Sequence, residues 1–340
     1  MEKILKQVCG IDVSQQELVV TMGRLCSDLT SELFASKTFS NSDKGLGALL
    51  EWVKKLMHPS VEVRFVMEAT GVYHERMAYF LYQKQQLISI ILPNKISNYF
   101  RTLEVKTITD KTASETIARF GLERKLDNWK PANPVFKKLR QLTRERDQLV
   151  QARTVAKNQL HAEQAEAEPN KTSVRRIKKQ IDLLNKQEQE IKSELAVLVK
   201  QTEVLKRKVN VITTIPGVGT LTSLIVLAET NGFELIRNKK QLISYAGLDV
   251  VDKQSGTSVR GKSRISKRGN KFLRKAMHLP ALSAIRNNER FKAIFARLVG
   301  KHGIKMKAAT AVQRKLLEMI YIIAKTEKNY ENTYLQKTRE

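Results

Sequence analysis

The stretch VCGIDVSQQELVVTM, residues 8–22, places one carboxylate, Asp12, inside a run whose apolar residues alternate and cluster as in a buried strand. Burying a charge costs several kcal/mol unless something pairs with it. Asp12 therefore either marks a strand end or belongs to a functional site. The rest of the chain has to separate these two readings.

Strand and helix patterns alternate through the first 130 residues. Runs of β-branched and apolar residues predict five strands, and apolar residues at helical spacing predict one helix. The strands are expected over 8–14, 17–22, 33–39, 61–67 and 87–92, and the helix over 43–57. Three early strands followed by alternating helices and strands indicate an α/β fold whose sheet has mixed strand directions.

The composition is strongly basic. The 340 residues include 61 Lys and Arg against 34 Asp and Glu, a formal net charge of +27. Such a surplus favours a polyanionic partner, nucleic acid before a membrane surface. The start MEKILKQVCG lacks an apolar signal core and no window resembles a membrane span, so we expect a soluble cytoplasmic protein with no membrane partner.

Two long heptad patterns follow the first region. Apolar residues repeat at four-three spacing from Val135 to Leu160 and from Ile177 to Val209, with AEPNKT between them. This predicts a central antiparallel coiled coil that is either a spacer arm or an oligomerisation arm, or both. The polar residues Arg146, Arg153 and Glu188 interrupt the seam. Four parts are expected: an α/β domain over 1–132, the arm over 133–209, a mainly helical C-terminal domain over 210–327 and a tail over 328–340.

Two further acidic residues join Asp12. Glu68 follows the apolar strand in VMEATG, and Asp110 opens TDKTASETIARFG, where Thr109 is a candidate helix N-cap. Carboxylates gathered in this way suit Mg²⁺, a hard cation that binds carboxylates, water and substrate phosphates. The sequence therefore predicts a magnesium site, formed by Asp12, Glu68 and Asp110, that supports phosphoryl transfer.

Residues 253–275, KQSGTSVRGKSRISKRGNKFLRK, contain nine basic residues and no acid. This basic segment is either a solvated loop or a surface that contacts phosphates, and its glycines favour the second by allowing close approach. The predicted contacts are Arg260, Lys262, Arg264, Lys267, Arg268, Lys271 and Arg274. The turn IPGVG, residues 215–219, is read equally well as a phosphate-binding turn or as a plain turn between helices.

These motifs carry a resemblance to a known family. GIDVS, MEATGVYH and TDKTASETIARFG resemble the N-terminal RuvC-like, ribonuclease-H-fold domain of the Piv-type transposases, the insertion-sequence family one-ten. IPGVGTLTSLIVLAE and YAGLDVVDKQSGTSVRGKSRISKRGNKFLRKAMHLPALSAIR resemble the C-terminal transposase domain of the same family. The similarity runs from about residue 5 to residue 325, with the predicted coiled coil between the two blocks.

The resemblance implies a transposase, a Mg²⁺-dependent site-specific DNA recombinase. Its C-terminal domain would supply a serine nucleophile, for which Ser255 in QSG fits best and Ser263 and Ser266 are the runners-up. The resemblance also implies donor and target DNA, a structured bridge RNA as guide, and a dimer that becomes a tetramer when two DNAs are synapsed. The alternatives are a Piv-like DNA invertase or junction-resolving nuclease, and a nucleic-acid-binding protein whose catalysis has lapsed.

One position departs from the family pattern. The family's acidic tetrad ends with a second aspartate three residues after the third carboxylate, and this chain has Ala113 there. Glu115 is five residues beyond Asp110, an offset that points away from the same helix face. Ala113 indicates a subgroup that works with three carboxylates, a catalytically impaired copy, or an engineered substitution.

Overall fold

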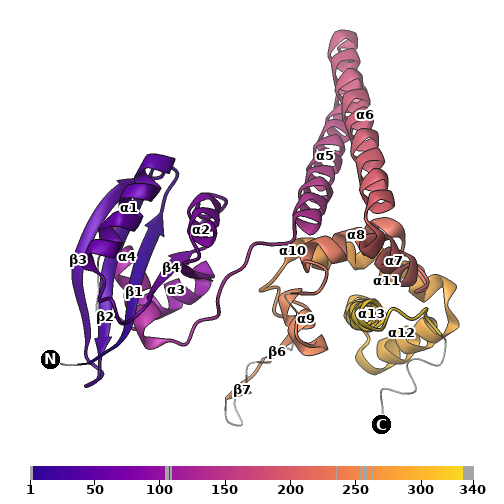
Figure 1. Ribbon diagram of the computed structural model, residues 1–340. Helices are drawn as coiled ribbons and strands as arrows, with labels where there is room; N and C mark the ends of the chain where they lie inside the picture. The colour runs from indigo at the N-terminus through magenta and orange to yellow at the C-terminus, as the bar shows by residue number, and fades with distance from the viewer. Residues whose placement is uncertain are drawn as a thin grey trace. The chain divides into compact units, whose positions relative to one another are not determined.

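The protein was analysed as a computed structural model that describes residues 3–103, 107, 109–234, 236–252, 254–255, 259–261 and 264–331. At residues 254, 255, 259 and 260 the description covers the backbone. The chain divides into two compact units, residues 1–131 and residues 132–340, which we call the first and the second unit (Figure 1). Within the described ranges, no helix combines the length and the apolarity that crossing a bilayer requires.

The first unit is built on a five-stranded mixed sheet, which confirms the predicted α/β class. The order is β3-β2-β1-β4-β5, with β1, β2 and β3 antiparallel and with β4 and β5 parallel to β1. The strands are β1 (Ile4–Val13), β2 (Glu17–Cys26), β3 (Ser31–Ser40), β4 (Val63–Glu68) and β5 (Leu87–Ile91). The first three extend beyond the predicted ranges because backbone pairing continues past the apolar alternation on which the prediction rested.

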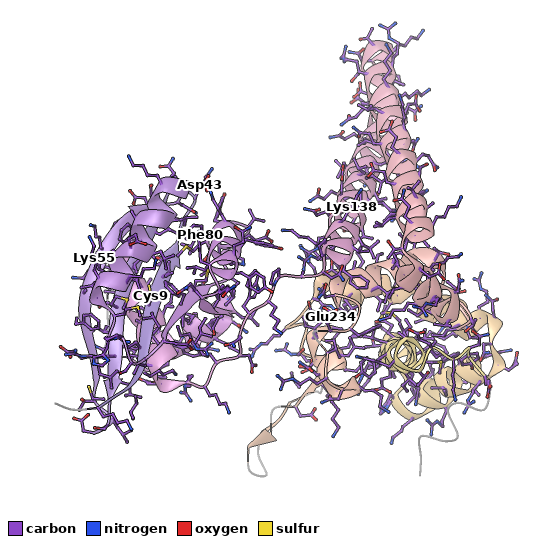
Figure 2. The ribbon with its side chains drawn as sticks, viewed as in Figure 1. Cys9, Asp43, Lys55, Phe80, Lys138 and Glu234 are labelled. Atoms are coloured by element: carbon purple, nitrogen blue, oxygen red, sulfur yellow. The ribbon has the colours of Figure 1, made fainter. Side chains whose placement is uncertain are left out.

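Helices cover both faces of this sheet. They are α1 (Asp43–Leu56), α2 (His74–Gln83), α3 (Pro93–Phe100) and α4 (Asp110–Glu123). One apolar cluster joins Cys9 and Ile11 of β1 to α1 and α2, with Phe80 at its margin (Figure 2). A second cluster joins Val8 of β1 and Val66 of β4 to α3 and α4. Successive residues of β1 therefore serve opposite faces, as the two-residue period of a strand requires.

The second unit begins with two long helices that pack side by side as an antiparallel hairpin (Figure 1). They are α5 (Pro134–Ala165) and α6 (Lys171–Gln201), and the side chain of Asn170 caps the start of α6. Between them the buried Glu188 forms ion pairs with Arg146, at 2.8 Å, and with Arg153. The three polar residues that interrupt the heptad pattern therefore form ion pairs with one another inside the helix pair.

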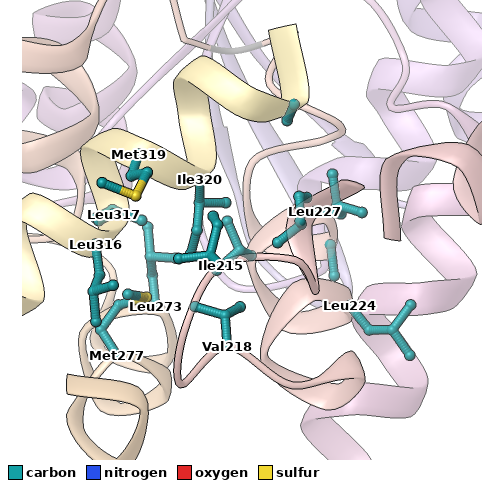
Figure 3. Packing of buried hydrophobic residues seen from close by; sticks show 14 of the residues in the cluster. Ile215, Val218, Leu224, Leu227, Leu273, Met277, Leu316, Leu317, Met319 and Ile320 are labelled. Atoms are coloured by element: carbon teal, nitrogen blue, oxygen red, sulfur yellow. The ribbon is translucent and has the colours of Figure 1, made fainter. Parts of the chain in front are cut away.

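The remainder of the second unit is a compact helical body. Its helices are α7 (Glu203–Ile212), α8 (Thr220–Glu229), α9 (Lys239–Tyr245), α10 (Lys271–Ala276), α11 (His278–Asn287), α12 (Glu289–His302) and α13 (Lys305–Thr326). Figure 3 shows the core, where Leu316 and Ile320 of α13 lie among apolar side chains from other helices. Leu139, Leu142, Ile191 and Leu195 of the helix pair belong to the same core.

Four strands of two residues each lie between α9 and α10. They are β6 (Val250–Val251), β7 (Gln254–Ser255), β8 (Val259–Arg260) and β9 (Arg264–Ile265). β6 pairs with β9 and β7 pairs with β8, both antiparallel. The basic segment thus includes short paired strands, which the sequence analysis did not predict because strands of two residues show no periodicity.

Candidate active site

Two carboxylates lie at the carboxyl ends of neighbouring parallel strands. Asp12 is the last residue but one of β1, and Glu68 is the last residue of β4. The register pairs Ile11 with Met67, so the next position on each strand sets Asp12 beside Glu68. The sheet therefore brings together two of the three predicted metal ligands.

Both carboxylates face the layer that contains α4. Val8 and Val66 belong to the apolar cluster on the α4 side of the sheet. Asp12 is four residues after Val8, and Glu68 is two residues after Val66. Because side chains on a strand alternate between faces, even separations put all four on the same face.

A glycine contact brings α4 directly onto β1. A Cβ atom added at Gly10 would lie 2.4 Å from the backbone nitrogen of Ala118 and 2.5 Å from the carbonyl oxygen of Ser114. A Cβ atom added at Gly121 would lie 2.8 Å from Cγ1 of Val8. The C-terminal part of α4 therefore lies over the start of β1, and the helix runs antiparallel to the strand.

This packing directs the start of α4 toward the strand ends. Asp110 is one helical turn before Ser114, so it lies on the same helix face, toward Asp12. The hydroxyl groups of Ser114 and Thr21 form a buried hydrogen bond of 2.7 Å, which fixes the helix against β2. The third predicted carboxylate is thus brought to the same edge of the sheet.

The N-terminus of α4 is capped as the sequence predicted. The Thr109 hydroxyl accepts a hydrogen bond from the Thr112 backbone N–H, and the Thr112 hydroxyl accepts one from the Thr109 N–H. Asp110 stands in the first turn, where the helix dipole favours a negative charge. The cap defines where the helix starts and therefore where Asp110 lies.

The carboxylates influence one another's protonation. Burial, and then the charge of Asp110, raise the pKa of Asp12, which a hydrogen bond from the Val13 backbone N–H partly lowers again. Burial and the charge of Asp12 raise the pKa of Glu68. A cation bound at this edge would relieve the mutual repulsion that these shifts express.

The donor set fits a hard divalent cation held with water. Among the described residues, no three His, Cys, Asp or Glu side chains are grouped closely enough to hold one ion. Mg²⁺ is usually bound by one or two carboxylates and retains several waters or substrate oxygens. The adjacent Asp12 and Glu68 match that requirement, with the exposed Asp110 across from them.

Ala113 leaves the fourth position of the site without a carboxylate. Its side chain lies in the first turns of α4 and is partly buried. The adjacent Ser114 is fully buried, and its hydroxyl also donates to the carbonyl of Lys111 at 2.8 Å. Ser114 is therefore committed to packing between helix and sheet, and it does not replace the missing acid.

The three candidate nucleophilic serines of the second unit differ in their structural surroundings. Ser255 lies in β7, opposite Val259 of β8. Ser263 lies outside the described residues, as does Lys262. The Ser266 hydroxyl donates a hydrogen bond of 2.5 Å to Asp249, and it accepts one from the Arg268 N–H. Ser266 therefore has a structural role in closing the base of the ribbon.

The basic residues predicted to contact phosphates also differ in their surroundings. Arg274 donates to the Ala246 carbonyl at 2.9 Å, and the Lys271 ammonium lies 5.2 Å from the centre of the Phe272 ring. Arg264 and Lys267 line a surface cavity. Arg268 is exposed, and Arg260 belongs to β8. Part of the predicted set thus holds the fold, and part remains open to a ligand.

Sequence reasoning missed a buried polar junction in the second unit. Glu229, 2% exposed, accepts two hydrogen bonds of 2.8 Å from Arg144 and one of 2.6 Å from Asn270. Tyr245 donates to the Glu229 carbonyl at 3.0 Å. The junction connects α5, α8 and the start of α10. The signal was a single glutamate at the end of the apolar run SLIVLAE.

Two regions of the chain match models of transposase domains. Residues 9–164 match a model of the IS110 DEDD transposases, described as "Transposase". Residues 209–296 match the model described as "Transposase IS116/IS110/IS902 family". The two matches occur in order along one chain and cover both units. Both matches are to domains of IS110-type transposases, so the chain is similar to that family over both units.

Relatives extend along nearly the whole chain. The "Pilin gene-inverting protein" of Moraxella lacunata is 26% identical over 330 residues, covering 96% of this chain and 98% of that protein. The protein of the same name from Moraxella bovis is 26% identical over 295 residues, covering 86% and 90%. Among solved structures, T. thermophilus RuvC in complex with a Holliday junction substrate is 12% identical, with a TM-score of 0.25, and covers 33% of this chain and 90% of that chain.

Proposed function

We propose that this protein is a Mg²⁺-dependent DNA recombinase that moves an insertion sequence. The observation that carries the proposal is the placement of Asp12 beside Glu68 at one sheet edge, with the charge of Asp110 acting on Asp12, in a chain whose two units match transposase models. The first unit is the ribonuclease-H-type catalytic domain in this proposal. The formal charge of +27 supplies the attraction for donor and target DNA.

The carboxylates hold the metal in this proposal. Bound Mg²⁺ supplies charge stabilisation for phosphoryl transfer. Asp12 and Glu68 present oxygen ligands from two rigid strands, and Asp110 adds negative charge from the capped helix. The raised pKa values of Asp12 and Glu68 make metal binding compete with protons as the pH falls.

Ser255 is the proposed nucleophile. Its Oγ forms a bond to the scissile phosphorus while the bond from phosphorus to the leaving strand's oxygen breaks. The hydroxyl proton of the serine passes to solvent water, and the leaving strand's oxygen takes one proton from solvent water. The phosphoserine link keeps the energy of the phosphodiester, so a second strand's hydroxyl reseals the DNA by the reverse reaction.

Guide RNA and assembly complete the proposal. A structured bridge RNA pairs with donor and target DNA. Its phosphates also bind to positively charged side chains of the protein. The α5–α6 hairpin acts as a coiled-coil arm through which a dimer becomes a tetramer on synapsis. Three apolar side chains on the outside of the hairpin, Val155, Leu183 and Val197, are 56%, 55% and 49% exposed and provide a contact surface.

The test traps the covalent intermediate. Purified protein and its copurifying RNA are mixed with Mg²⁺ and a suicide DNA substrate, and the adduct is located by peptide mass spectrometry. Asp12→Asn and Ser255→Ala should each abolish the adduct while folding persists. Asp28→Asn, an exposed carboxylate in the β2–β3 turn, is the matched control and should react normally. An adduct at Ser263 or Ser266 would overturn the assignment to Ser255.

The product distinguishes the enzyme alternatives. Rejoined strands support a transposase or an invertase, and an inverted segment as the sole rejoined product identifies the invertase. Cut strands with free phosphates and no adduct indicate a junction-resolving nuclease, because attacking water discards the bond.

Ala113 favours a second candidate function, nucleic-acid binding after loss of catalysis. If the site is a damaged tetrad, Ala113→Asp should raise both Mg²⁺ affinity and strand transfer, because it adds a carboxylate one turn into α4. No gain in a chain that is already active supports natural function with three carboxylates. Inactivity of both forms supports the binding protein.

A further inference from the structure

A cavity of about 420 Å³ opens beside the basic segment. It lies between the β6–β9 pair and helices α12 and α13. Apolar side chains form most of its wall, among them Ile265, Leu298, Ile304, Met306 and Ala311. Ile304 and Met306 are 56% and 62% exposed, so the second unit's own core does not cover this wall.

The rim of the cavity is cationic. Arg264, Lys267, Lys307 and Arg314 line it together with His302, and no Asp or Glu is found among the described lining residues. Arg264 and Arg314 make no ion pair within the part of the chain that the structure describes. An apolar wall beneath a cationic rim fits a ligand that is itself flat and apolar but carries negative charge at its edge.

A second hollow of about 520 Å³ continues the cavity. The two share Ile265, Lys267, Met306 and Thr310. The second hollow extends the cationic lining toward Lys271, Arg274 and Lys275. Its one acid, Asp147, is already paired with Lys275 at 2.5 Å. Lys267, Lys271 and Arg274 therefore continue the positive charge beyond the cavity, along a track longer than a single phosphate.

We infer that this groove binds an unpaired nucleotide of DNA, with its base in the apolar cavity and the flanking phosphates on the cationic track. A paired base cannot enter, because both of its faces are stacked in the duplex, whereas an extruded base can fill an apolar pocket. A protein ligand is disfavoured by the nearly uniform positive charge. The inference rests on the proposed function, since strand exchange opens the duplex that supplies the unpaired nucleotide.

The test compares binding to three DNA duplexes of one length. The first is fully paired, the second has one unpaired nucleotide, and the third has an abasic spacer at that position. Fluorescence anisotropy of the full-length protein at fixed salt should show about ten-fold tighter binding to the duplex with the unpaired base than to the abasic one. A matching RNA bulge is the fourth ligand, and it should not be preferred to the DNA.

Three variants locate the base. Ala311→Trp fills the cavity without changing charge and should remove the preference for the unpaired base, with affinity for the paired duplex unchanged. Ala296→Trp, on the exposed side of α12, is the matched control and should keep the preference. If Ala311→Trp fails to fold, Met306→Ser replaces it, because Met306 is exposed and its loss leaves the core intact.

The outcomes separate the inference from the proposed function. Normal duplex binding with equal affinity for base and abasic spacer overturns the pocket and leaves the recombinase intact. A preference that survives both cavity variants, or an equal loss of affinity for all DNAs, also overturns it. Preference for the RNA bulge overturns the assignment to DNA. Failure to bind any nucleic acid refutes the proposed function itself.

Discussion

Replacing Gly10 by Ala should separate α4 from the sheet and weaken the metal site. The new Cβ would lie 2.4 Å from the Ala118 nitrogen and 2.5 Å from the Ser114 oxygen. Both are backbone atoms of α4, so no side-chain rotation can relieve the overlap. Ordinary van der Waals contact begins at 3.4 Å, and the helix must therefore move by about 1 Å.

The expected cost follows from this displacement. Overpacking a well-packed interior costs typically about 1–3 kcal/mol, and a contact with backbone on both sides belongs at the upper end. For a unit of 131 residues each kcal/mol lowers the melting temperature by roughly 4 °C, so we expect a loss of about 10 °C. The displaced helix carries Asp110 with it, which should also lower Mg²⁺ affinity.

The chain supplies its own local probe for the measurement. Its two tryptophans, Trp52 and Trp129, both lie in the first unit, so tryptophan fluorescence follows unfolding of that unit alone. Thermal melts with and without Mg²⁺ measure stability and metal binding in the same sample. The gain in melting temperature on adding Mg²⁺ should be smaller in Gly10→Ala than in the unaltered protein.

The matched control is Gly47→Ala, in the middle of α1. A Cβ there meets nothing within 4 Å. Because alanine is the better helix former, this variant should gain about 0.5–1 kcal/mol. Equal melting temperatures for Gly10→Ala and the unaltered protein would refute the close packing of α4 on β1, and with it the placement of Asp110.

Three other predictions concern charge and surface. Because the pKa values of Asp12 and Glu68 are raised, the metal-free folded protein retains protons that the unfolded chain releases above about pH 4. Its stability should therefore fall as the pH rises from about 4 through the raised values, and Asp12→Asn should reduce that fall in fluorescence melts taken upward from about pH 4. Glu229→Gln should lower the unfolding free energy of the second unit by about 2 kcal/mol in circular-dichroism melts. This is less than the cost of breaking a fully buried ion pair, because the Arg144 side chain is 41% exposed to solvent. An unchanged melting curve would count against the junction. Val155→Lys combined with Leu183→Lys should reduce the sedimenting mass with helicity unchanged, whereas an unchanged mass would make the arm a spacer.

The sequence could single out the three carboxylates as candidates because the pattern around each one is local, and their role in binding metal stays a prediction. Asp12 and Glu68 lie at the ends of apolar strands, and Asp110 follows a threonine N-cap. Each of these patterns can be recognised within about ten residues of sequence. Gly10 and Gly121 were not singled out, because their need for close approach arises only when α4 lies over β1. Sequence could place the acids along the chain but not the helix that directs Asp110 toward Asp12.

The second unit was less predictable because several of its features depend on contacts between residues far apart in the sequence. The long helices are defined by an apolar repeat, and the structure places them over 134–165 and 171–201. The β ribbon has no period, and Glu229 is interpretable only once Arg144 and Asn270 are beside it. The cavity is built from residues of β6, β9, α12 and α13 that are scattered between Val250 and Arg314.

The α5–α6 hairpin has a mechanical consequence. A helix of 32 residues is about 48 Å long, and a tilt of about ten degrees at its base moves the tip by about 8 Å. Sliding one helix past the other would separate Glu188 from its two arginines and leave this buried carboxylate with only Lys192 of its own helix as an ion-pair partner. The hairpin therefore resists shear and behaves as a lever. Near its base Arg144 is joined through Glu229 to Asn270, so force applied at the tip is delivered to the residue from which α10 starts.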